Sequence, residues 1–191
     1  VYKRQAAARC SQMLNIADIA RDADISQKQA KDWLGILETL GIIFYLHPYS
    51  NNLLKRLVKT PKLYFYDTGL VCYLTKWSSA ETLESGAMNG AVLENYVVAE
   101  IMKTYLNSGK EPFMYYYRDK DAKEIDIVLE HDGVLNPLEI KKSSNPGTEL
   151  VKVFDLLDKS STPRSKGAVL CMKPELSAID RDNYIIPIWM I

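Results

Sequence analysis

Apolar and polar residues alternate with helical spacing over the first forty positions and then give way to short strand-like runs. The composition of the opening segment favours a helix, and two further segments repeat the helical spacing of apolar positions. Asn15 and Ser26 stand where N-caps are expected, and Gly41 stands where a helix usually ends in a left-handed residue. The predicted elements are helices over 2–14, 16–23 and 27–40 and strands over 42–46 and 63–66.

This order of helix, short helix, turn, helix and two strands is typical of a winged helix-turn-helix domain. The expected buried face of its third helix consists of Ile25, Ala30, Trp33, Leu34, Leu37 and Leu40. On the outer face we expect Gln27, Lys28, Gln29, Lys31 and Asp32. The segment 47–62 would form the wing or an extended loop. Asp67-Thr-Gly69 is predicted to be a turn in which Asp caps and Gly supplies a positive φ.

Basic residues in this first part are candidates for contacts with DNA phosphates. The candidates are Lys28 and Lys31 on the helix and Lys55, Arg56, Lys59 and Lys62 on the wing. The alternative is that they are solvated charges on a fold used for protein contacts, and the pattern leaves both open.

A polar stretch of small residues at 76–89 predicts a linker, with the winged helix at 1–75 and a second, α/β domain at 90–191. The second domain is expected to begin with a long helix over 90–106, in which Glu94 falls among apolar positions. A carboxylate near an apolar face is costly unless it is paired or bound to a ligand. The remaining predicted elements are strands at 113–118, 167–172 and 184–189, a hairpin at 124–142 and a helix at 147–159.

The hairpin carries the candidate chemistry. Its turn lies at 131–133, and regular alternation would place Glu124, Asp126 and Val128 on one face of its first strand. On its second strand Glu139 and Lys141 share a face. If the faces coincide, carboxylates suited to Mg²⁺ or Mn²⁺ meet an ammonium that can steady developing negative charge. The structural alternative is an ordinary set of cross-strand ion pairs, and for Arg118 a salt bridge is the expected role.

Composition and charge narrow the classes of function and location that the sequence allows. Lys and Arg total 24, as do Asp and Glu, but residues 1–75 carry a net charge of +4 and residues 76–191 a net charge of −4. Bulk electrostatics therefore does not indicate nucleic acid, and only local basic surfaces can. Three isolated cysteines and the lack of an apolar run long enough to cross a bilayer predict a cytoplasmic protein without disulfides, zinc or membrane attachment. Because the sequence opens at Val1, directly in helical sequence, we expect it to be part of a longer protein.

The acids at 94, 126 and 139 and the lysine at 141 resemble the pattern of the PD-(D/E)XK nuclease superfamily, here read as E124-I-D126 and E139-I-K141. More narrowly, the chain resembles the C-terminal module, domain of unknown function 4143, of a prokaryotic family of AAA-type P-loop ATPases. The segments that carry this resemblance are LNIADIA, KRLVKTPKLYFYDTGL, VLENYVVAE, YYYRDKDAKEIDIVL and PLEIKKSSNP.

The resemblance implies a mixed α/β fold in which a winged helix precedes a nuclease-like domain with a central mixed sheet. It implies that Asp126, Glu139 and the Ile140 carbonyl hold Mg²⁺ or Mn²⁺, that Lys141 assists the attacking water, and that Glu94 completes the acidic cluster.

The implied partners are DNA and an ATPase domain preceding the module. The chain lacks GxxxxGK[ST], so ATP enters only through that other domain. The leading hypothesis is a DNA-interacting module with a metal-dependent nuclease-like site. The alternative is a non-catalytic DNA- or protein-binding adaptor that regulates the ATPase. The sequence leaves open whether the module forms homo-oligomers.

Overall fold

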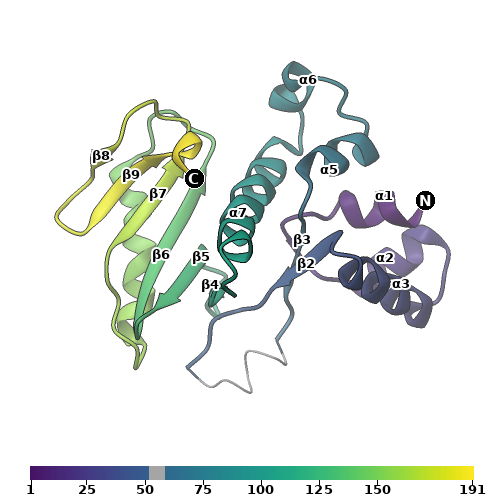
Figure 1. Ribbon diagram of the computed structural model, residues 1–191, viewed down its shortest axis with the longest axis horizontal. Coiled ribbons are helices and arrows are strands. Elements are labelled where there is room, and N and C mark those ends of the chain that lie inside the picture. Colours follow the sequence, from purple (N-terminus) through teal and green to yellow (C-terminus); the bar gives the residue numbers. More distant parts are fainter. Residues whose placement is uncertain (52–58) are drawn as a thin grey trace. The chain divides into compact units, whose positions relative to one another are not determined.

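The protein is described by a computed structural model that covers residues 1–51 and 59–191 (Figure 1). It has a mixed α/β fold with a three-stranded and a six-stranded sheet among these residues, in agreement with the predicted fold class. The chain divides into two compact units, one formed by Val1–Leu46 with Thr60–Lys103 and the other by His47–Lys59 with Thr104–Ile191.

The first unit combines small helices with a three-stranded antiparallel sheet of order β1-β3-β2. Its elements are α1 (Tyr2–Ala7), β1 (Gln12–Met13), α2 (Ile16–Ala23), α3 (Gln27–Thr39), β2 (Ile43–Leu46), β3 (Lys62–Phe65), α5 (Thr68–Thr75), α6 (Ala80–Ser85) and α7 (Asn89–Asn107), of which α7 extends past the end of the unit. The three helices and the strand pair β2/β3 follow the order expected of a winged helix-turn-helix.

The local signals for α2 and α3 are confirmed. Asn15 caps α2 by accepting a hydrogen bond from the Asp18 N–H. Ser26 and Gln29 form a reciprocal capping box at the start of α3. Gly41 has a φ of 65°, the left-handed conformation expected just after the helix.

Two predicted segments fold differently. The helix expected over 2–14 ends at Ala7, because Ser11 has a φ of 62° and donates its N–H to the Leu63 carbonyl at 2.8 Å, which brings the chain into the sheet as β1. Asp67 begins a helix instead of a turn: its side chain accepts the Leu70 N–H at 3.0 Å and caps α5. Gly69 therefore lies within a helix and does not have a positive φ.

The stretch expected to be a linker, 76–89, contains α6, and the helix after it packs with the first unit as far as Lys103. The attachment is a buried amide. Asn95 of α7 accepts the Phe65 N–H at 2.8 Å and donates to the Phe65 carbonyl at 3.0 Å, so that it completes the backbone hydrogen bonds of β3. This explains why the contacts of α7 group it with β3.

The second unit is built on a six-stranded mixed sheet of order β4-β5-β6-β7-β9-β8. Its elements are β4 (Met114–Arg118), β5 (Glu124–His131), β6 (Val134–Lys141), η1 (Thr148–Lys159), β7 (Gly167–Cys171), β8 (Ser177–Ala178), β9 (Asn183–Pro187) and η2 (Ile188–Met190). Strands β6, β7 and β9 are parallel, and the other neighbours are antiparallel.

The core of the second unit lies between the sheet and the 3-10 helix η1. Phe154 and Leu157 of η1 are fully buried and pack in one cluster with Leu135 and Val169 of the sheet. The β5–β6 hairpin turns at Asp132 and Gly133, whose φ angles of 49° and 74° are those of a tight type I′ connection. This turn fixes the register of the hairpin that carries the candidate acids.

None of the helices in residues 1–51 and 59–191 combines the length and apolar character needed to span a bilayer.

Candidate functional site

The β5–β6 hairpin brings Asp126 to the Glu139-Ile140-Lys141 segment. The antiparallel register pairs Ile127 with Leu138, so that Asp126 and Glu139 occupy the next positions on the two strands. The Ile140 N–H donates to Asp126 Oδ2 at 2.8 Å. The expected meeting of the two strands at this point is therefore present in the structure.

A β-bulge in β5 lies beside Asp126. Tyr115 pairs with Val128 and Tyr117 with Ile125, so three steps along β5 face two steps along β4. Ile125 and Val128, which regular alternation would place on opposite faces, accordingly pack in the same core cluster. The alternation behind the expected shared face of Glu124, Asp126 and Val128 is thus interrupted. A bulge can re-aim a side chain, and here the bond to Ile140 fixes the direction of the Asp126 carboxylate.

Glu139 and Lys141 form an ion pair on β6, with 2.6 Å between Lys141 Nζ and Glu139 Oε1. Their partners on β7 are the apolar residues Val169 and Cys171. The Glu139 side chain is only 9% exposed, whereas the Lys141 side chain is 39% exposed. The Glu139 carboxylate is therefore nearly buried, whereas the Lys141 ammonium can contact a ligand that arrives from solvent.

Arg118 and Glu124 form the cross-strand salt bridge that the structural alternative predicts. They are directly paired on β4 and β5, and Arg118 Nη1 lies 3.2 Å from Glu124 Oε2. This pair joins the last residue of β4 to the first residue of β5, two positions before Asp126.

Glu94 belongs to the first compact unit and has partners there. Its Oε1 accepts hydrogen bonds from Lys62 Nζ at 2.9 Å and from the Tyr64 hydroxyl at 2.6 Å. The Lys62 side chain is 5% exposed. Lys62, predicted to contact DNA on the wing, is therefore the buried partner of Glu94 and does not present its charge at the surface.

The donor set at the hairpin consists of oxygen atoms. Among the described residues, no three His, Cys, Asp or Glu side chains come together as a metal-binding group. The set predicted at the hairpin requires two carboxylates, from Asp126 and Glu139, with the backbone carbonyl of Ile140. Hard oxygen donors of this kind fit Mg²⁺ or Mn²⁺ in ligand type.

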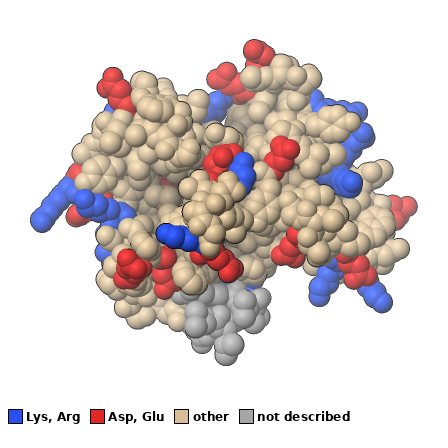
Figure 2. Space-filling view, viewed as in Figure 1, with Lys and Arg blue, Asp and Glu red and all other residues tan. Residues whose placement is uncertain are grey.

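The remaining predicted DNA contacts are unevenly placed. Lys28 and Lys31 are exposed on α3, and Lys59 is exposed in the second unit. Lys55 and Arg56 lie outside the described residues. On the face shown in Figure 2, basic and acidic side chains are interspersed.

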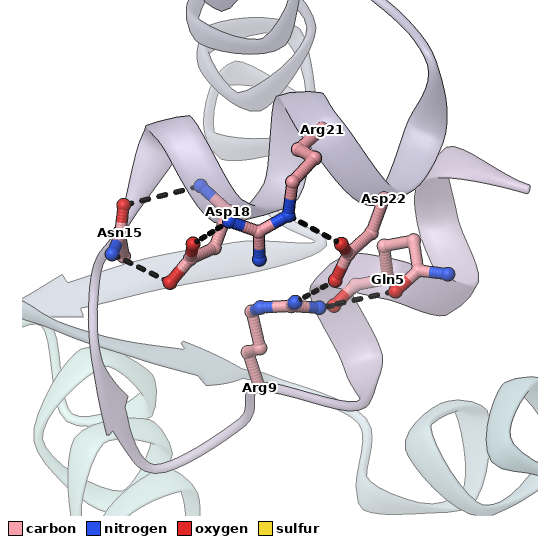
Figure 3. Close-up of polar contacts among 6 residues, drawn as sticks. All are labelled: Gln5, Arg9, Asn15, Asp18, Arg21 and Asp22. Atoms are coloured by element: carbon pink, nitrogen blue, oxygen red, sulfur yellow. Dashed lines mark hydrogen bonds and ion pairs between the residues drawn. The ribbon is translucent and has the colours of Figure 1, made fainter.

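Two arginines of the first unit are paired with acids (Figure 3). Arg9 donates to Asp22 and to the Gln5 side chain, and it thereby joins the segment after α1 to α2. Arg21 Nη1 lies 2.8 Å from Asp18 Oδ1. The Arg9 guanidinium is the main reason that the pKa of Asp22 is lowered. These cations are compensated locally, so they add little to a nucleic-acid surface.

An apolar surface on α3 was missed because helical spacing placed its residues in the core. Ala30, Leu34 and Leu37 are buried as expected, but Trp33 is 40% and Leu40 66% exposed. Ile36, 55% exposed, lies between them on the neighbouring face of the helix. The signal available in the sequence was the width of the apolar arc, which with Ile36 included is broader than the stripe of roughly 100° on an ordinary surface helix.

Comparisons with known proteins place the chain in a family. Residues 89–191 match the model described as Domain of unknown function (DUF4143), and residues 2–81 match Domain of unknown function (DUF8612). Uncharacterized proteins of Mycobacterium tuberculosis and Mycobacterium bovis are each 30% identical over 135 residues, which is 71% of this chain and 30% of each relative. The aligned part of the chain thus spans about 30% of the length of these curated relatives. No solved structure matches it. Because the first model covers more than half of the chain, the protein belongs to the DUF4143 family.

Proposed function

We propose that the chain is a nucleic-acid-interacting module of an AAA-type ATPase, with a divalent-metal-dependent site that cleaves phosphodiesters. The observation that carries this proposal is the junction of Asp126 with the Glu139-Ile140-Lys141 segment through the 2.8 Å bond to the Ile140 N–H. The resemblance to PD-(D/E)XK nucleases assigns chemistry to these positions. The aligned relatives are much longer than the chain, so they have room for a further domain.

Asp126, Glu139 and the Ile140 carbonyl would hold the cation, which when bound supplies charge neutralisation and a water acidic enough to act at neutral pH. Lys141 would orient that water or donate to a phosphate oxygen, because its ammonium lies beside Glu139 and is partly open to solvent. Glu139, fixed within β6 between apolar neighbours, would hold the lysine in position through the ion pair.

Nicking of supercoiled plasmid by the purified protein in Mn²⁺ tests this proposal. Lys141→Ala is expected to slow nicking by about 100-fold or more while leaving the circular dichroism spectrum unchanged. Lys142→Ala is the matched control, because Lys142 is exposed and adjacent, and it should nick as the natural protein does. Absence of cleavage on DNA and RNA in both Mg²⁺ and Mn²⁺, or full activity in Lys141→Ala, would reject the nuclease.

A second candidate function, a protein-binding adaptor, is favoured by the exposed apolar surface of α3, which consists of Trp33, Ile36 and Leu40. A hollow of about 590 Å³ beside it has an apolar floor that includes Trp33, Ile36 and Leu74 and a basic rim of Lys3 and Arg4. This combination suits an amphipathic partner helix with acidic flanking residues. Ile36→Glu should abolish capture of such a partner, here a synthetic acidic amphipathic helix. Lys28→Glu, on the polar side of α3, should not. Equal binding by the natural protein and Ile36→Glu would reject the adaptor surface.

A further inference from the structure

The second unit contains a pocket of about 470 Å³ that does not include Asp126, Glu139 or Lys141. The end of β4 and the turn after it form one wall, the end of η1 forms another, and Tyr49 to Asn51 with Lys59 form a third. Tyr49 is almost fully buried in the core of this unit. All of these segments belong to one compact unit, so the pocket is a property of that unit alone.

Among the described residues, four cationic residues line this pocket against a single carboxylate. The cations are Lys59, Arg118, Lys120 and Lys159, and the acid is Asp119. Within residues 1–51 and 59–191, no carboxylate forms an ion pair with any of the three lysines. Arg118 is paired with Glu124, so the three lysines are the source of a local positive potential in a chain whose net charge is zero.

The acid in this pocket, Asp119, accepts hydrogen bonds from the backbone. Asp119 Oδ1 accepts the Asp121 N–H at 2.8 Å and the Lys123 N–H at 2.9 Å, and it thereby holds the turn between β4 and β5. An oxygen that accepts two backbone hydrogen bonds is less able to neutralise a neighbouring ammonium. The turn that Asp119 fixes is also the one that carries Lys120, so the acid helps to position a cation.

The wall opposite this turn is preformed. The Tyr49 N–H donates to the Tyr116 carbonyl at 2.6 Å, and the Tyr49 hydroxyl lies 3.2 Å from Ser160 Oγ. Ser160 in turn donates to Asn51 Oδ1 at 2.7 Å. A pocket whose wall is already hydrogen-bonded loses little entropy when a ligand enters.

An aromatic residue stands next to the cations. Tyr117 lines the pocket at the end of β4, and burial raises the pKa of its phenol. Its hydroxyl therefore stays protonated at neutral pH and can donate to an anion. Its ring offers a surface on which a base can stack.

We propose that this pocket binds a phosphate ester that carries an aromatic base, either a segment of single-stranded nucleic acid or a free nucleotide. The ammonium groups of Lys59, Lys120 and Lys159 would contact the phosphate, and Tyr117 would contact the base. The volume lies within the range of ordinary small-ligand sites. The proposal is independent of cleavage at the hairpin, because the two sites share no lining residue.

Fluorescence anisotropy with a labelled single-stranded oligonucleotide, in EDTA, tests the pocket. Lys120→Glu with Lys159→Glu is expected to weaken binding by about tenfold or more and to lower the slope of log K against log salt by about two. Lys110→Glu is the matched control. It makes the same kind of charge change at an exposed position outside the pocket, and it should bind within about threefold of the natural protein.

Two further arms identify the ligand and isolate the site. Competition by a free nucleotide at concentrations that displace the oligonucleotide indicates a nucleotide site, whereas competition only by unlabelled strands indicates a strand site, and both support the pocket. Loss of binding in Lys28→Glu with Lys31→Glu, combined with full binding in the pocket variant, would overturn it. An equal loss in Lys110→Glu, or no binding by the natural protein to strand or nucleotide, would also overturn it. Because binding is measured in EDTA and nicking requires Mn²⁺, failure at the hairpin and failure at the pocket are distinguishable.

Discussion

Two lysine–carboxylate pairs, one in each compact unit, have similar distances and different surroundings. Lys62 and Glu94 in the first unit are 2.9 Å apart, and Lys141 and Glu139 in the second are 2.6 Å apart. The Lys62 side chain is 5% exposed and is joined at Glu94 by a tyrosine hydroxyl, whereas Lys141 is 39% exposed. The comparison teaches that a short lysine–carboxylate distance does not by itself mark a functional site, because exposure of the cation decides which pair can meet a ligand.

Breaking the buried pair should give the largest effect on stability. Glu94→Ala leaves the Lys62 ammonium inside the first unit without its carboxylate, and we expect a loss of about 3–5 kcal/mol in the free energy of unfolding. Urea denaturation followed by circular dichroism measures it. The double variant Lys62→Met with Glu94→Leu should recover most of the loss, because it removes both charges together.

The exposed pair supplies the contrast. Glu139→Ala removes the carboxylate and leaves the Lys141 ammonium where solvent can screen it, so we expect a loss of only about 1 kcal/mol in the free energy of unfolding. If Glu139→Ala were as destabilising as Glu94→Ala, the distinction between a structural and an accessible pair would fail.

The buried amide of α7 should give the next largest effect. Asn95→Ala leaves the N–H and the carbonyl of Phe65 without their side-chain partner, and we expect a loss of about 3 kcal/mol in the free energy of unfolding. Asn107→Ala, on the exposed end of the same helix, is the control and should change stability by less than about 0.5 kcal/mol. Equal effects of the two substitutions would show that Asn95 does not hold α7 to β3.

The sequence predicted the parts of the fold that rest on local chemistry. Caps at Asn15 and Ser26, the left-handed Gly41 and the hairpin turn at Asp132-Gly133 are each determined by a few neighbouring residues. Strand order within the mixed sheet and the packing of α7 are set by contacts distant along the chain, so periodicity could not reveal them.

The same limit applies to the candidate site. Asp126, Glu139 and Lys141 were predicted from the residue pattern, and the hairpin places Asp126 beside the Glu139-Ile140-Lys141 segment. The bulge beside Asp126 was not predicted, because an extra residue in one strand can be recognised only by comparison with the partner strand. The partners of Glu94 were not predicted either. A carboxylate among apolar positions signals a partner without saying which one, and Lys62 and Tyr64 lie about thirty positions away in the chain.

Acid should weaken the second unit through the ion pair between Asp158 of η1 and Arg164, which follows this helix. The Arg164 guanidinium donates to both carboxylate oxygens of Asp158 and lowers its pKa below the usual value. A depressed folded-state pKa stabilises the fold above the unfolded-state value of about 3.9, and the gain is lost as pH falls through the folded-state value. Unfolding free energy measured between about pH 5 and pH 2 should therefore fall less steeply in Asp158→Asn than in the natural protein. Identical slopes would contradict this assignment.

Thiol labelling gives the smallest effect and compares two cysteines within the first unit. Cys10 is fully buried, and burial raises its pKa to about 12, whereas Cys72 is only partly buried. A disulfide reagent at pH 8 should label Cys72 in the folded protein and Cys10 only after unfolding. Labelling of Cys10 at the rate of Cys72 would show that the core around α1 opens readily.

Binding of Mn²⁺ measured by electron paramagnetic resonance tests the central claim most directly, because it needs neither a substrate nor turnover. We expect the natural protein to bind Mn²⁺ and the variants Asp126→Asn and Glu139→Gln to lose this binding. Glu94→Gln should retain it, because Glu94 is hydrogen-bonded to Lys62 and Tyr64. Binding that survives in Asp126→Asn, or that disappears in a folded Glu94→Gln protein, would contradict a cation site centred on the β5–β6 hairpin.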